Sequence, residues 1–122
     1  MALPPTAGRR RVLVVEDEVI VAMLIEDMLG DLGYDVVALS THLDEALTFA
    51  RTMPIDVAVL DVNLNGEMSF PVADVLRARG IPFVFATGYG PRVLGAPYVG
   101  TPTLQKPFQI GELQRMLEEA TA

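Results

Sequence analysis

"VLVVEDE", residues 12–18, decides the fold prediction, because four apolar residues that favour β-structure run directly into three carboxylates. A short apolar run with no polar alternation is typical of a strand buried on both faces of a parallel sheet. Three similar runs and one weaker run follow, so the expected strands are residues 12–15, 36–39, 55–60, 83–86 and 102–105. A strand end does not need three negative charges, so they require a separate explanation.

The segments between these strands carry apolar residues at helical spacing, which predicts helices over residues 19–29, 43–50, 70–79 and 110–119. The βα alternation is typical of a doubly wound α/β sandwich around a central parallel sheet. Residues 88–103 interrupt the pattern with four glycines and three prolines in sixteen positions. Because both residue types disfavour helices, the fourth helix is expected to be short or disordered.

Composition limits the possible functions. A chain of 122 residues is expected to form one domain without an output domain. No apolar run reaches the roughly 18 residues of a membrane helix, and no targeting segment is present, so we expect a cytoplasmic protein. The absence of cysteine and the single histidine, His42, exclude thiolate and histidine-based metal sites. The net charge of -7 argues against nucleic acid as a direct ligand, and favours a protein or a cation.

The candidate functional residues lie at the carboxyl ends of the predicted strands. In open α/β sheets, ligands bind outside the carboxyl ends of the strands. The polar residues expected at these ends are Glu16 and Asp17, Asp61, Thr87 and Lys106. Carboxylates that converge on one rim repel each other unless a cation compensates, and hard oxygen ligands favour Mg²⁺. Together with a hydroxyl and an ammonium, they are typical of a phosphoryl-transfer site in which an aspartate is the nucleophile.

Asp61 is the preferred nucleophile. It opens "DVNLNG", residues 61–66, where Asn65-Gly66 predicts a sharp turn that leaves the Asp61 carboxylate exposed. Glu18 is expected to begin the first helix and to point away from the rim.

These residues, taken in order, resemble the receiver domain of bacterial two-component response regulators, from about residue 11 to residue 119. The resemblance implies a flavodoxin-like sheet with strand order 2-1-3-4-5 and a cis peptide bond between Lys106 and Pro107. It also implies that Asp61 is the phospho-acceptor and that Thr87 and Lys106 bind the phosphoryl group. The ligands of Mg²⁺ are expected to be Glu16, Asp17, Asp61 and the backbone carbonyl of Asn63.

"FATGYG", residues 85–90, is similar to a single-domain subgroup named for a Phe-Ala-Thr-Gly motif, from which Gly90 departs. The family often has an aromatic switch residue three positions before the lysine, where this chain has Thr103. We therefore expect phosphorylation to order the loop that follows Thr87, in place of an aromatic rotation.

The predicted function is that of a single-domain response regulator, with residues 1–10 as a flexible tail and residues 11–122 as the receiver domain. A sensor histidine kinase or a phosphotransfer protein is expected to phosphorylate Asp61. The product either changes contacts with an unknown downstream protein or serves as a phosphate sink. The domain is not expected to be an enzyme, apart from catalysing its own phosphorylation and dephosphorylation.

Two alternatives stay open. A Mg²⁺-dependent phosphatase or phosphotransferase also uses an aspartate nucleophile, but commonly has a second acid where this chain has Asn63. A flavodoxin-like cofactor binder needs a phosphate loop after the first strand, where "EDE" repels phosphate.

Overall fold

The protein is an α/β sandwich with a parallel sheet at its centre, in a computed structural model that describes residues 9–88, 98 and 100–122. The five sheet strands run in the order β2-β1-β3-β6-β7, which is the expected 2-1-3-4-5 when the strands of this sheet are counted along the chain. Their bounds are β1 (Arg11–Val15), β2 (Asp35–Ser40), β3 (Val57–Asp61), β6 (Phe83–Thr87) and β7 (Thr103–Gln105).

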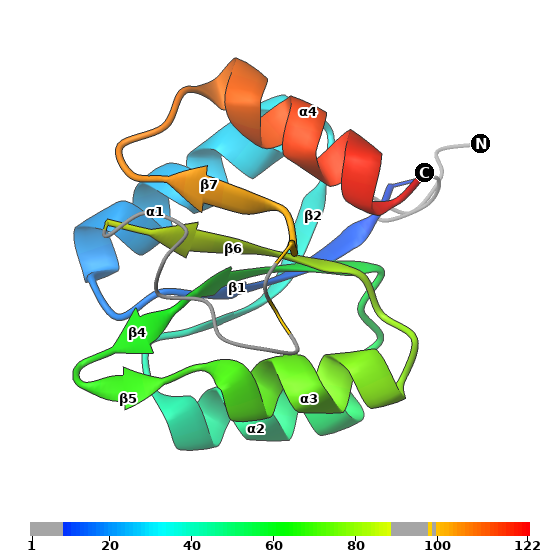
Figure 1. Ribbon diagram of the computed structural model, residues 1–122. Coiled ribbons are helices and arrows are strands. Elements are labelled where there is room, and N and C mark those ends of the chain that lie inside the picture. The colour runs from blue at the N-terminus through cyan, green and yellow to red at the C-terminus, as the bar shows by residue number, and fades with distance from the viewer. Residues whose placement is uncertain (1–8, 89–97, 99) are drawn as a thin grey trace.

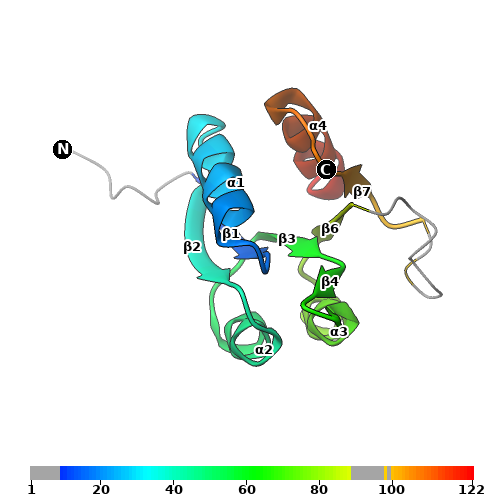
Figure 2. The same cartoon turned by 90° about the vertical axis from the view of Figure 1, so that its left-hand side faces the viewer.

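Two helix layers cover the sheet. Helices α1 (Val19–Asp31) and α4 (Ile110–Ala120) lie on one face, and α2 (Leu43–Thr52) and α3 (Phe70–Ala78) lie on the other, as Figures 1 and 2 show. Because successive strand residues point to opposite faces, Val12 and Val14 join the apolar cluster under α1 and α4, whereas Leu13 and Val15 join the cluster over α2 and α3. This two-sided burial is the reason why β1 reads as a continuous apolar run.

Strand β3 begins two residues later than predicted. Ile55 is buried, but the backbone N–H of Asp56 donates to the Arg11 carbonyl and the Asp56 carboxylate binds the Arg11 guanidinium. Burial of Ile55 therefore extends the apolar run without extending the strand.

A hairpin that the sequence analysis did not predict follows β3. It consists of β4 (Asn63–Leu64) and β5 (Glu67–Met68), which pair in antiparallel fashion. Asn65 and Gly66 connect them with φ angles of 54° and 90°. Two consecutive positive φ angles define the tight turn that Asn-Gly favours and that matches the twist of a hairpin. The predicted turn is confirmed, and it also forms two short strands.

Most of the segment expected to hold a short or disordered fourth helix lies outside the described residues, as does most of the expected N-terminal tail. The proposed ordering of the loop after Thr87 concerns the same undescribed residues. In the described part of the chain, each helix is too short or too polar to cross a membrane.

Candidate functional site

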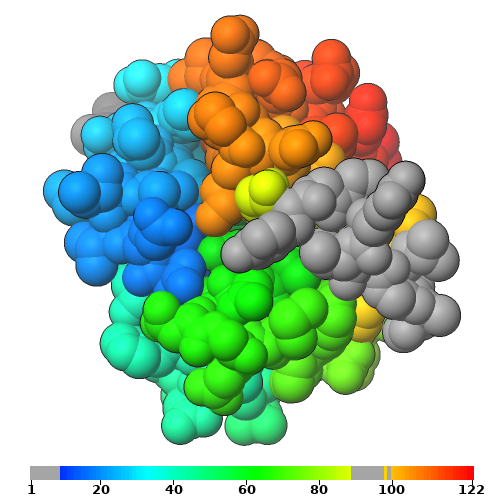
Figure 3. Space-filling view, turned by 60° about the vertical axis from the view of Figure 1, so that its left-hand side comes forward, coloured from blue at the N-terminus to red at the C-terminus, as the bar shows by residue number. Residues whose placement is uncertain are grey.

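The predicted site residues meet at one rim of the sheet. Glu16 and Asp17 directly follow β1, and Asp61 and Thr87 are the last residues of β3 and β6. Asp61 is in register with Ala86, so Thr87 lies one position further along the neighbouring strand. Figure 3 shows residues after β1 in blue, residues after β3 in green and residues after β7 in orange meeting at this rim.

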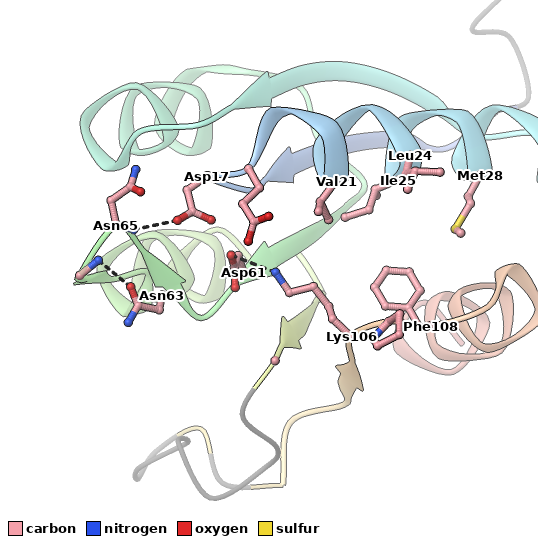
Figure 4. A pocket seen from close by; sticks show the side chains of 14 residues that line it. Asp17, Val21, Leu24, Ile25, Met28, Asp61, Asn63, Asn65, Lys106 and Phe108 are labelled. Carbon is pink, nitrogen blue, oxygen red and sulfur yellow. Dashed lines mark hydrogen bonds and ion pairs between the residues drawn. The ribbon is translucent and has the colours of Figure 1, made fainter.

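Lys106 connects two of the acids. Its Nζ lies 2.7 Å from Glu16 Oε1 and 3.2 Å from Asp61 Oδ2. Burial alone lowers the pKa of Lys106, but its hydrogen bond to Glu16 and the charge of Asp61 outweigh burial and raise it. The ammonium is therefore held charged against the two carboxyl groups, and Figure 4 shows its contact with Asp61.

Asp61 is buried, with 6% of its surface exposed, so the expectation of an exposed carboxylate is wrong. The chain after Asp61 folds back as a hairpin at Asn65-Gly66. The N–H of the next residue, Val62, donates to the Ala86 carbonyl of β6, so Asp61 stays paired within the sheet. Burial, followed by the charge of Glu16, raises the pKa of Asp61 to about 7, against the opposing effect of Lys106. Near neutral pH, and without a bound cation, the Asp61 carboxyl group is therefore only partly ionised.

Asp17 behaves in the opposite way. Burial alone raises its pKa, but hydrogen bonds with the carboxyl groups of Glu16 and Asp61, and from the backbone N–H of Asn65, lower it overall. The Asn65 nitrogen lies 3.0 Å from Asp17 Oδ2. The tip of the hairpin therefore holds a charged carboxylate at the rim, as the dashed line in Figure 4 shows.

Glu18 is the N-cap residue of α1, so its predicted place at the start of the helix is confirmed. The prediction that its carboxylate points away from the rim is wrong. Carboxylate oxygens of Glu16, Asp17 and Glu18 lie within 4.8 Å of one another. The backbone N–H of Glu18 donates to Glu16 Oε2 over 3.1 Å. Helical periodicity locates the start of the helix, but does not determine where an exposed N-cap side chain turns.

Thr87 and Lys106 are joined through the backbone. Thr87 is 1% exposed, and its carbonyl accepts a hydrogen bond of 2.8 Å from the Lys106 N–H. The peptide bond between Lys106 and Pro107 is cis, which confirms that prediction.

A cavity of about 740 Å³ opens beside the rim. Asp17, Asp61, Asn63 and Lys106 line its polar part. Its apolar part lies between α1 and the segment after β7, and is lined by Val21, Leu24, Ile25, Met28, Pro107 and Phe108 (Figure 4). This apolar wall was not predicted from the sequence, because its residues come from two distant segments and those on α1 fit an ordinary helix pattern.

The donor set fits a hard divalent cation. Mg²⁺ is bound by oxygen atoms and typically takes one or two protein carboxylates together with waters. Glu16 and Asp17 belong to the group of close carboxylates, and Asp61 faces them across the rim. The carbonyl of Asn63 belongs to β4, in which Asn63 pairs with Met68. These four residues could hold Mg²⁺.

The family model for the "Response regulator receiver domain" matches residues 12–118 of this chain. The chain belongs to this family. Receiver domains are signalling domains of two-component systems, in which an aspartate accepts a phosphoryl group. The match includes every residue that was predicted for the site.

Among the curated relatives, the transcriptional regulatory protein PdtaR of Mycobacterium tuberculosis is 31% identical over 117 residues, which cover 93% of this chain and 57% of that protein. The DNA-binding response regulator MtrA of Mycobacterium leprae is 33% identical, with 48% of its length covered. This receiver domain thus spans about half the length of the curated relatives it matches.

Among solved structures, that of SdrG from Sphingomonas melonis Fr1 is 40% identical, has a TM-score of 0.84, and covers 93% of this chain and 98% of that one. The receiver domain of a sensor histidine kinase from Pseudomonas aeruginosa is 29% identical, with a TM-score of 0.79 and coverages of 93% and 98%. That structure has a magnesium ion coordinated in its active-site cleft.

Proposed function

We propose that Asp61 accepts a phosphoryl group from a phosphohistidine on a sensor histidine kinase or a phosphotransfer protein. The single observation that carries this proposal is the buried Asp61 carboxyl group beside Lys106, at the strand end of a receiver domain. An Asp61 oxygen forms a bond to phosphorus while the bond from phosphorus to the imidazole nitrogen breaks. The nitrogen keeps the electron pair of that bond, and Asp61 becomes an aspartyl-phosphate.

We further propose that Glu16, Asp17, Asp61 and the backbone carbonyl of Asn63 hold Mg²⁺. When bound, the ion would neutralise charge on the transferred group. The close carboxylates at the rim support this assignment, as does the magnesium ion in the Pseudomonas aeruginosa receiver domain.

Lys106 and Thr87 act on the product in this proposal. The Lys106 ammonium neutralises a phosphoryl oxygen, and the Thr87 hydroxyl binds another, which draws the end of β6 towards the phosphate. A phosphoryl group adds a charge of about -1.5 to -2, enough to change the surface around the rim. A downstream protein then reads the altered contacts, or the domain serves as a phosphate sink in a relay.

Membership of the single-domain subgroup with the Phe-Ala-Thr-Gly motif stays a prediction that rests on residues 85–88. A cytoplasmic location, residues 11–122 as the receiver unit, and catalysis of its own phosphorylation and dephosphorylation are parts of the same proposal.

The phosphatase or phosphotransferase alternative has less support. Such an enzyme needs an acid near the leaving group, and Asn63 cannot donate a proton as an acid does. The Asn63 Oδ1 atom already accepts a hydrogen bond of 2.7 Å from the Gly66 N–H. A phosphate monoester should therefore be hydrolysed no faster than in buffer.

Intact-mass measurement after incubation with acetyl phosphate and Mg²⁺ tests the phospho-acceptor. We expect one added phosphoryl group that hydroxylamine removes, because an acyl phosphate reacts with this nucleophile and a phosphoserine does not. Asp61→Asn should abolish the adduct, whereas Asp27→Asn, the same change at an exposed position of α1, should keep it. An unchanged rate in Asp61→Asn would refute the assignment.

A Mg²⁺ titration tests the ligands. Asp17→Asn should weaken binding more than Glu18→Gln, because Asp17 is restrained by Asn65 and faces Asp61, whereas Glu18 is exposed. Equal losses in the two variants would assign Glu18 an equal share in the site.

A further inference from the structure

The β4–β5 hairpin is anchored firmly for so short an element. At its base, the Ser69 N–H donates to the Val62 carbonyl over 2.9 Å. Leu64 is 2% exposed and belongs to the apolar cluster over α2 and α3. At its tip, the Gly66 N–H donates to Asn63 Oδ1. The position of the Asn65-Gly66 turn is therefore set by the core and by the strand end at Asp61.

The turn contacts the Asp17 carboxylate. Asp17 is partly exposed and stands beside the carboxylates of Glu16 and Glu18, so repulsion favours its rotation into solvent. The Asn65 N–H, 3.0 Å from Asp17 Oδ2, opposes this rotation. A hydrogen bond to a charged acceptor is roughly twice as strong as one between neutral groups.

The hairpin also orients the Asn63 carbonyl. Leu64 and Glu67 flank the two-residue turn, and Asn63 pairs with Met68 one step further from it. In an antiparallel ladder the pair that closes a two-residue turn is hydrogen-bonded and the next pair is not. The ladder therefore fixes the direction of the Asn63 backbone without requiring its carbonyl as an acceptor.

We propose that the β4–β5 hairpin positions two ligands of the cation site, Asp17 through the N–H of Asn65 and the carbonyl of Asn63 through the strand pairing. Asn65 and Gly66 are positioning residues, and the cation affinity depends on their turn. This inference rests on the proposed function, in which Asp17 and the Asn63 carbonyl bind Mg²⁺. Groups that orient metal ligands are commonly worth about 10- to 100-fold in metal affinity.

Gly66→Ala is the primary test. A Cβ at Gly66 would meet no atom within 4 Å, so the change acts only through the φ angle of 90°, which alanine disfavours. The matched control is Gly33→Ala, because Gly33 has a φ of 88°, equally free space, and a position after α1. Both variants should lose similar stability in urea, but only Gly66→Ala should weaken Mg²⁺ binding, by about tenfold or more.

Two changes at Asn65 separate the donor from the side chain. Asn65→Gly keeps the N–H and the positive φ angle, so its Mg²⁺ affinity should stay within about twofold of wild type. Asn65→Pro removes the N–H and should weaken binding at least as much as Gly66→Ala. Thermal unfolding of each variant without Mg²⁺ establishes that it is folded.

The affinities are measured by titrating Mg²⁺ into the ¹⁵N-labelled protein and following amide resonances. In the wild type the Asn65 amide should shift strongly, because its acceptor oxygen belongs to a residue that binds the cation. If Gly66→Ala and Gly33→Ala bind Mg²⁺ equally well, the positioning role is wrong while the cation site stands. If wild-type protein does not bind Mg²⁺, this inference and the proposed cation site both fail.

Discussion

Lys106 Nζ lies 3.2 Å from Asp61 Oδ2, so an ammonium from the end of β7 meets a carboxyl group from the end of β3. The two residues are 45 positions apart in the sequence, and only the parallel sheet brings them together. At this distance Asp61 lies close to a positive charge, although the carboxylates of Glu16, Asp17 and Glu18 gather at the same rim. Lys106 therefore favours the ionised form of Asp61, against the effects of burial and of the Glu16 charge.

Lys106→Met should raise the pKa of Asp61 above its value of about 7, because the lysine charge is the influence that lowers it. The methionine keeps an unbranched apolar side chain and removes only the charged end. Lys106→Arg should leave the pKa of Asp61 near the wild-type value. The measurement is a pH titration of the Asp61 carboxyl carbon by NMR without Mg²⁺, and an unchanged pKa in Lys106→Met would contradict the electrostatic coupling.

Asp61→Asn should stabilise the Mg²⁺-free protein at alkaline pH. The pKa of Asp61 is about 7 in the fold, and is expected to be about 3.9 in the unfolded chain, so folding favours the protonated acid. The contribution of protonated Asp61 to stability is therefore full below about pH 4 and is lost as the pH rises to about 7. At about pH 8 the variant should be more stable by on the order of 1–3 kcal/mol, and below about pH 4 the difference should vanish. Urea unfolding at both pH values with EDTA provides the measurement, and a less stable variant at pH 8 would exclude the predicted burial cost.

Much of this fold is predictable from residue patterns, because the parallel strands are buried on both faces. Strand β1 consists of Arg11 followed by four buried valine and leucine residues, so its apolar run coincides with the strand. The strand order was implied by the family resemblance. The meeting of Asp61 with Lys106 follows from the parallel sheet that the βα alternation predicts, because the carboxyl ends of its strands share one edge. These features depend on many residues together, and single side-chain rotations do not alter them.

The parts that could not be predicted depend on single contacts. Strands of two residues, as in β4 and β5, are too short for any periodicity, and Asn65-Gly66 indicates only the turn. The burial of Asp61 and the orientation of Glu18 depend on which neighbours fold back over the rim. The hydrogen bond from Asn65 to Asp17 joins residues 48 positions apart through a backbone N–H, which no side-chain motif can indicate.

Asp56→Asn should lower stability near neutral pH, by a small amount because both partners are partly exposed. Arg11 Nε and Nη2 lie 3.0 and 3.1 Å from the two Asp56 oxygens, and the hydrogen bonding of Arg11 lowers the pKa of Asp56. A lowered pKa gives stability that is present above about pH 4 and is lost as the pH falls through the folded value. The midpoint temperature of thermal unfolding should therefore be lower for the variant than for wild type at neutral pH, and the difference should be smaller at about pH 2. A temperature difference that grows as the pH falls would contradict the predicted contribution of ionised Asp56 to stability.

Tyr98 connects the segment before β7 to α3. Its ring is 2% exposed and stacks on Phe70, with the ring centroids 5.4 Å apart, and meets Phe85 edge to face at 5.7 Å. The hydroxyl donates a hydrogen bond to Asp74, and the Arg77 guanidinium lies 4.6 Å from the ring centre. Burial, followed by the hydrogen bond to Asp74, raises the pKa of Tyr98 to about 12.

Tyr98→Phe should lower the free energy of unfolding by about 0.5–1.5 kcal/mol, because the ring contacts remain and only one hydrogen bond to a solvated carboxylate is lost. Tyr98→Ala should cost about 3–5 kcal/mol, because it also empties the aromatic cluster.

The raised pKa of Tyr98 also predicts that this stability depends on pH. Stability that depends on a neutral Tyr98 is full below about pH 10 and is lost as the pH rises towards 12. Urea unfolding at pH 7 should rank the variants in this order, and the stability difference between wild type and Tyr98→Phe should shrink above about pH 10. If Tyr98→Phe and Tyr98→Ala lose equal stability at pH 7, the hydrogen bond to Asp74 rather than the aromatic packing holds this segment on α3.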